Sequence, residues 1–202
     1  MSYIQKATNN YFGFMPAYGG AKVGVYTVSS SEGSAISIGD VLVLTTIGTM
    51  RIVTGAYSSA IAGVAASPLA ANAGSTAPTR FGGDAATLLK VWDDPYQVFV
   101  TCDTTSGLIG STGVYKNVAV LATGAVGDTG PIGFQSRMAI SAVTASSGSV
   151  LPFRVLGLHP VEDGFSTDAN GAGVAASVRK LLVQPNNHSR GLGTASLTLI
   201  TS

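Results

Sequence analysis

The stretch YQVFVTCD at residues 96–103 decides the fold class of this chain, because its side chains repeat with a period of two. Every second residue from Tyr96 to Cys102 is apolar, and in an extended strand these side chains fall on one face. The turn signal Asp93-Asp94-Pro95 stands directly before the stretch, and Asp94 is predicted to start the turn. Residues 96–103 are therefore predicted to form a β-strand that follows a tight turn.

Short apolar segments of the same kind lie on both sides of this strand, with Gly and Ser in nearly every break. Residues 23–27 alternate, and residues 41–44 form a continuous apolar run that fits a strand buried on both faces. Sustained 3.6-residue periodicity is absent, so the chain is predicted to be all-β, a sandwich or barrel of many short antiparallel strands. The further predicted strands are residues 50–54, 61–65, 114–121, 137–143, 151–158, 178–183 and 197–200. Residues 175–182 could form one short helix instead, although the β-branched Val178 and Val183 of the run at 178–183 favour a strand.

The N-terminal segment, residues 1–20, follows neither the helical nor the alternating pattern, yet it holds many large apolar side chains. Such side chains gain little in an irregular segment unless they lie in grooves, where each contributes roughly 1.5 to 3 kcal/mol. We therefore expect residues 1–20 to form an extended arm that docks on its own domain or on a neighbouring subunit. The residues of this arm that are predicted to contact a partner are Tyr3, Ile4, Tyr11, Phe12, Phe14, Met15 and Tyr18.

The remaining chain, residues 21–202, is long enough for one compact β-rich domain or for two small β units that share a seam. A break between two such units would fall near residues 85–90 or near residue 160. Residues 68–83 and 104–113 are loops of small residues. The first is unusually long for a loop inside a domain, so it is either a surface loop or a segment that orders against a neighbouring subunit.

The composition favours a subunit of an assembly over a freely diffusing monomer. Hydrophobic residues make up 46% of the chain and charged residues only 10%, well below the usual share of a soluble domain. The 11 basic and 10 acidic residues are scattered singly, so direct binding of nucleic acid is not expected. No signal peptide and no apolar stretch of membrane-spanning length is apparent, so we expect no contact with a membrane.

Residues that could carry chemistry are few and isolated. Cys102 is the single cysteine and is expected to be a small buried apolar residue, while His159 and His188 are expected at the surface or in turns. The tripeptide at residues 128–130, Asp-Thr-Gly, occurs once and fits turn chemistry, and the glycine pattern at residues 171–176 follows a polar loop where a dinucleotide fingerprint would follow a strand. We therefore expect no enzyme activity, no cofactor and no metal site.

Four segments carry short strand and turn motifs: IGDV at residues 38–41, IAGVA at residues 61–65, VWDDPYQVF at residues 91–99 and LPFRVLGL at residues 151–158. In this succession they resemble the small, β-rich capsid decoration (cement) proteins of tailed bacteriophages. The resemblance covers roughly residues 21–158. It implies a structural protein, without catalytic residues, that binds the outside of an expanded icosahedral shell and clips neighbouring capsomers. The implied partners are the major capsid protein and further copies of this chain, often as a trimer, on the capsid exterior of a virion assembled in the host cytoplasm.

A second structural interpretation stays open at this point. The chain could be the base of a head or tail fibre, or a receptor-binding module that recognises glycans. Exposed tyrosines and tryptophans around a groove would favour that function, but Trp92 is the single tryptophan and stands beside a turn. A major shell subunit is disfavoured by the length of the chain and by the lack of a long helix.

Overall fold

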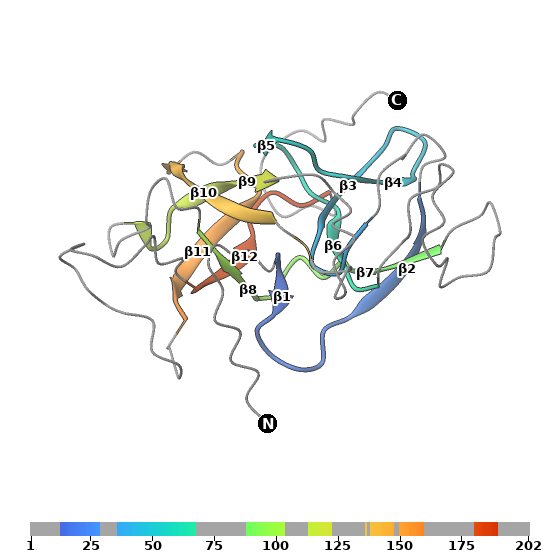
Figure 1. Cartoon of the computed structure of the whole chain (residues 1–202), viewed down its shortest axis with the longest axis horizontal. Coiled ribbons are helices and arrows are strands. Elements are labelled where there is room, and N and C mark those ends of the chain that lie inside the picture. The colour runs from blue at the N-terminus through green and yellow to red at the C-terminus, as the bar shows by residue number, and fades with distance from the viewer. Residues whose placement is uncertain are drawn as a thin grey trace.

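The chain folds into two antiparallel sheets, so the predicted all-β fold class is confirmed (Figure 1). The computed structural model describes residues 13–28, 36–67, 88–103, 113–122, 136, 138–147, 150–159 and 180–189. Residues 1–12 of the predicted arm, the loop at 68–83 and nearly all of the loop at 104–113 lie outside the described residues. The strand predicted at residues 197–200 lies outside them as well.

The smaller sheet has five strands in the order β2-β7-β6-β3-β4. Val28, directly after β2, forms an isolated parallel bridge with Met50 of β4. Because β2 and β4 are the outer strands, this bridge brings the two edges together at one end and curls the sheet toward a barrel, as Figure 1 shows where β2 approaches β4. The strands are β2 Val23–Thr27, β3 Val41–Leu44, β4 Met50–Ile52, β6 Gly63–Ala65 and β7 Leu88–Trp92.

The larger sheet has the order β1-β8-β12-β11-β9-β10, and β5 pairs with β9 beside this path. This sheet curls as well, because Asp103, directly after the second strand β8, forms a parallel bridge with Ile140 of the outer strand β10. The strands are β1 Met15–Pro16, β5 Ala56–Tyr57, β8 Phe99–Cys102, β9 Asn117–Ala122, β10 Met138–Ser146, β11 Phe153–Leu158 and β12 Lys180–Pro185.

One hydrophobic core draws side chains from both sheets, from Val41 and Leu42 of β3 to Phe153 of β11 and Leu181 of β12. Three phenylalanines form part of it. Phe14 stacks on Phe153 with ring centroids 4.6 Å apart, and Phe99 meets Phe153 edge-on at 6.3 Å. The chain passes between the two sheets more than once, since β1 and β5 belong to the larger sheet although they precede β7 of the smaller one. The two curled sheets therefore share their interior.

Several strands agree closely with the sequence patterns. β3 is buried on both faces, as its continuous apolar run predicts, and the segment after residue 180 is the strand β12 with Leu181 and Val183 buried. The turn before β8 is confirmed, since Asp94 accepts from the N–H of Gln97 at its carbonyl and from the N–H of Tyr96 at its carboxylate. This turn uses residues 94–97, so β8 begins only at Phe99.

Candidate partner-binding surface

The second half of the predicted arm belongs to the molecule's own sheet. Met15 of β1 pairs with Val100 of β8, and the N–H of Ala17 donates to the carbonyl of Val98 at 2.9 Å. The side chain of Phe14 is fully buried in the core. The predicted contact of Phe14 with a partner is therefore corrected to a contact within the chain, because its ring packs on Phe153.

Close backbone contacts fix this segment at Gly13. The N–H of Phe14 donates to the carbonyl of Gly39 at 2.9 Å, and the N–H of Ser136 donates to the carbonyl of Ile38 at 3.1 Å. Gly13 has a φ of +72°, and a Cβ atom added there would lie 2.3 Å from Cβ of Ser136. Only glycine fits this conformation and this space without strain. The chain is thus tied to the loop before β3 from Gly13 onward.

Asp40 is the buried polar centre of the same junction. Its carboxylate accepts from the N–H of Ser37 at 2.7 Å and forms a hydrogen bond with the side chain of Ser136. Oγ of Ser136 in turn accepts from the N–H of Met138 at 3.1 Å. Burial raises the pKa of Asp40 from 3.8 to about 6, although both hydrogen bonds act to lower it. The Gly39-Asp40 pair thus connects the start of β3 in the smaller sheet to the start of β10 in the larger one.

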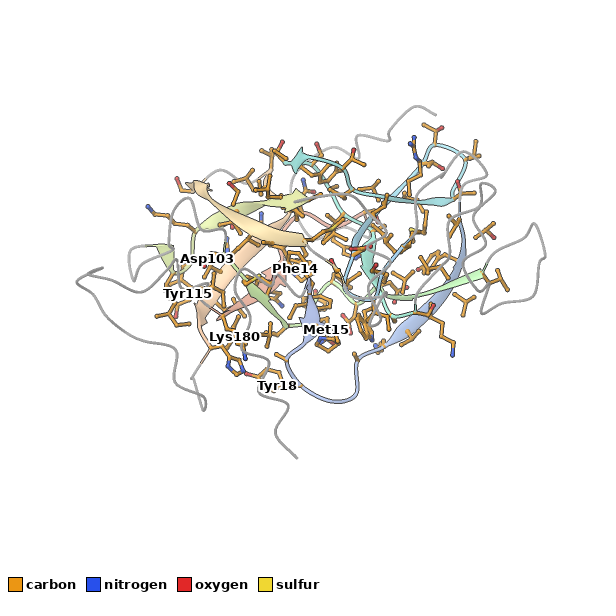
Figure 2. All side chains as sticks on the ribbon, viewed as in Figure 1. Phe14, Met15, Tyr18, Asp103, Tyr115 and Lys180 are labelled. Carbon is orange, nitrogen blue, oxygen red and sulfur yellow. The ribbon has the colours of Figure 1, made fainter. Side chains whose placement is uncertain are left out.

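Two of the predicted contact residues lie on the surface. Met15 is 38% exposed and Tyr18 is 63% exposed. In Figure 2, Tyr18 lies at the lower margin of the molecule, whereas Phe14 lies closer to its centre. The structure therefore brings Met15 and Tyr18 to the outside of β1 and the turn that follows it. The other predicted contact residues, Tyr3, Ile4, Tyr11 and Phe12, lie outside the described residues.

A second exposed apolar surface, which the sequence patterns did not indicate, is the outer side of β2 and β7. Val23 is 48% exposed, Val25 is 58% exposed and Leu88 is 60% exposed. The register of the two strands pairs Val25 with Lys90, so these side chains stand on one side of the sheet. We call this surface the β2–β7 face, and it consists of Val23, Val25, Thr27, Leu88 and Lys90, which are all exposed. Contiguous exposed apolar side chains of this kind mark contact surfaces.

The orientation of β2 is fixed from its other side. The hydroxyl of Tyr26 donates a hydrogen bond to the buried carboxylate of Asp93. A Cβ atom added at Gly24 would lie 2.6 Å from Oδ2 of Asp93 and 2.6 Å from the ring of Tyr26. Gly24 therefore leaves the space that this pair occupies. With Tyr26 held inward, Val23 and Val25 point outward, although an alternating strand usually directs its valines to the core.

The residues considered for chemistry are placed as follows. Cys102 is buried, as predicted. His188 is also buried, which corrects its predicted place at the surface; it lies among the bends after β12, where its backbone forms a bridge with Ile61. His159 is half-buried at the end of β11. Residues 128–130 and 171–176 lie outside the described residues.

The described part of the chain contains no group of three or more His, Cys, Asp or Glu side chains that could hold a metal ion. No helix within that part is long and apolar enough to cross a membrane. Comparison with protein-family models, with curated proteins and with solved structures finds no match for this chain. Two apolar surfaces are thus candidates for contact with a partner: Met15 with Tyr18, and the β2–β7 face.

Proposed function

We propose that this chain is a structural virion protein that binds the outer surface of a phage capsid and stabilises the contacts between capsomers. The observation that carries the proposal is the β2–β7 face, where Val25 and Leu88 are more than half exposed on a regular pair of strands. Apolar area on a rigid sheet can be buried against a partner at little entropic cost, because its backbone is already ordered.

The proposed task is adhesive and needs no reacting group. It needs apolar area that is removed from water at the interface between subunits. It also needs few charges at that interface, because each would have to be desolvated. Charged residues make up only 10% of this chain. Many copies on one shell would then stabilise it together, even where each single contact is weak.

The N-terminal arm has a divided role in this proposal. Residues 1–12 with Tyr3, Ile4, Tyr11 and Phe12 are proposed to contact the major capsid protein, next to the exposed Met15 and Tyr18. Phe14 anchors the arm in the domain and makes no contact with the shell, since its side chain is buried. Because Phe14 is fixed in the core, a force on residues 1–12 bound to the shell would be transmitted to the core of the domain.

Binding to empty sites on a shell tests the proposal. Capsids assembled from the major capsid protein of the same genome, without this chain, are incubated with the purified protein and sedimented. Saturable co-sedimentation is expected, and Leu88→Lys on the β2–β7 face should weaken it. Ile47→Lys is the matched control, because Ile47 is 72% exposed but lies in the turn between β3 and β4.

The proposal fails if the folded protein does not co-sediment, or if the two lysine variants behave alike. Binding to an array of glycans, without binding to capsids, would favour a receptor-binding module instead.

A further inference from the structure

The backbone hydrogen bonds of Lys90 in β7 show which backbone groups of the smaller sheet lie at its free edge. The carbonyl of Lys90 accepts from the N–H of Ala66 at 2.8 Å, and its N–H donates to Oγ of Ser67 at 3.1 Å. Ala66 and Ser67 directly follow β6, so both backbone groups of Lys90 point toward that strand. Consecutive residues of an antiparallel sheet direct these groups to opposite sides, so Leu89 and Val91 direct theirs toward β2.

On β2, the residues that meet these groups are Gly24 and Tyr26. The backbone groups of Val23 and Val25 therefore point to the other side of the strand. β2 is the outermost strand of the smaller sheet, and its bridge to β4 lies beyond it, at Val28. The N–H and C=O groups of the two valines thus have no strand beside them in the described part of the chain. A strand edge with unpaired backbone groups at two exposed valines is suited to pairing with another strand.

We propose that β2 pairs with β2 of a second copy of this chain, antiparallel and about a two-fold axis at Gly24. In this register Val23 of each copy stands opposite Val25 of the other. The N–H and C=O groups of both valines then all find partners across the axis. The inference does not depend on the proposed function.

The strand is complementary to itself, which favours a second copy over an unrelated partner. Gly24 would face Gly24 of the other copy at a position without hydrogen bonds, where the two Cα atoms approach to about 4.5 Å. No residue of β2 is charged, and Lys22 would stand opposite Tyr26, so no two lysines face each other. The chain carries a formal net charge of only +1, so long-range repulsion between copies is small.

Pairing of the edges would also cover exposed apolar area. Val23 and Val25 of both copies would stand side by side on the outer side of the joined sheet. The two β2–β7 faces would then form one continuous apolar surface. Such a contact is two-fold, in contrast to the trimer that the resemblance implies.

Sedimentation of the full chain over a wide range of concentration tests the pairing. A reversible dimer of a 20.3-kDa chain is expected. Val25→Lys should raise the dissociation constant at least ~10-fold, because a charged side chain on an edge opposes strand pairing. Leu88→Lys is the control, since it lies on the same face but one strand away from the edge, and it should leave the dimer unchanged. Both positions are exposed, so both variants should keep the fold, which circular dichroism checks.

Exchange of amide hydrogens locates the contact. The amides of Val23 and Val25 should exchange more slowly as the concentration rises, while those of residues outside β2 should not change. A protein that stays monomeric, a trimer, or a dimer that Leu88→Lys disrupts as strongly as Val25→Lys would overturn the inference. Unchanged exchange at both valines in a dimer would overturn it too.

A pair of cysteines tests the register. With Val23→Cys and Val25→Cys in one chain, oxidation should join two copies, while Val25→Cys alone should join few. Efficient cross-linking of Val25→Cys alone would place the two-fold axis at Val25 and contradict an axis at Gly24. The native Cys102 is buried and does not compete.

Discussion

The ring of Phe14 is stacked on the ring of Phe153, with 4.6 Å between centroids and 18° between planes. This contact joins the start of the described chain to β11, far along the sequence. It divides the predicted arm at Gly13, because everything from Phe14 to Ala17 is held by the core or by β8. Only residues 1–12 of that arm are left as a segment whose contacts the structure does not describe.

Phe14→Ala should destabilise the fold by about 3 to 5 kcal/mol, the usual cost of removing a buried phenylalanine. Chemical denaturation followed by circular dichroism measures the change in the free energy of unfolding. Met15→Ala is the matched control at the neighbouring position, and because Met15 is 38% exposed it should cost far less. Equal losses in the two variants would mean that the stacking of Phe14 on Phe153 contributes little.

Gly13→Ala should lower the free energy of unfolding by roughly 1 to 3 kcal/mol, because the new Cβ would crowd Ser136. The φ of +72° adds backbone strain. Thermal unfolding measures the effect. Gly19→Ala serves as the control, since a Cβ atom there meets nothing within 4 Å. A melting temperature unchanged by Gly13→Ala would contradict the close approach of Gly13 to Ser136.

Asp40→Asn should remove a dependence of stability on pH. The pKa of Asp40 rises from 3.8 to about 6 on folding, so the folded state binds the proton more tightly than the unfolded state. This contribution to stability is complete below the unfolded value and is lost as the pH rises through the folded value. The loss corresponds to about 3 kcal/mol.

The free energy of unfolding, measured by urea at a series of pH values, should therefore fall for the wild type relative to Asp40→Asn between about pH 4 and about pH 7. Asparagine keeps an oxygen that can accept from the N–H of Ser37, so the junction itself is preserved. Parallel curves for the two proteins would contradict the raised pKa of Asp40.

Much of the fold could be predicted from local patterns. The apolar run of β3 and the turn at Asp94 depend on neighbouring residues alone, and both were predicted. The two-residue strands β1 and β5 carry no pattern, and they form only because distant strands β8 and β9 offer them an edge. β7 was missed as a strand because its two adjacent leucines hide the alternation that the structure shows.

The candidate surface could be predicted only in part. The exposed Met15 and Tyr18 were among the predicted contact residues, but the buried position of Phe14 depends on Phe153, which no local pattern reveals. The outward direction of Val25 was also beyond prediction. It depends on the hydrogen bond between the side chains of Tyr26 and Asp93, which stand 67 residues apart in the sequence.

Deletion of residues 1–12 should abolish binding to capsids and leave the free energy of unfolding nearly unchanged. Deletion of residues 1–20 should also lower stability, because it removes Phe14 from the core and β1 from the sheet. Co-sedimentation and chemical denaturation of the two truncated proteins separate these effects. Full binding by the shorter deletion would contradict a role of Tyr3, Ile4, Tyr11 and Phe12 in contacts with the shell.

A single-particle reconstruction tests the proposed capsid role without any substitution. Shells built from the major capsid protein of the same genome are imaged before and after incubation with this protein. We predict added density on the outer surface, across seams between capsomers, with the β2–β7 face or the segment around Tyr18 against a neighbouring subunit. An unchanged shell, or bound protein that turns both surfaces toward solvent, would contradict the proposal.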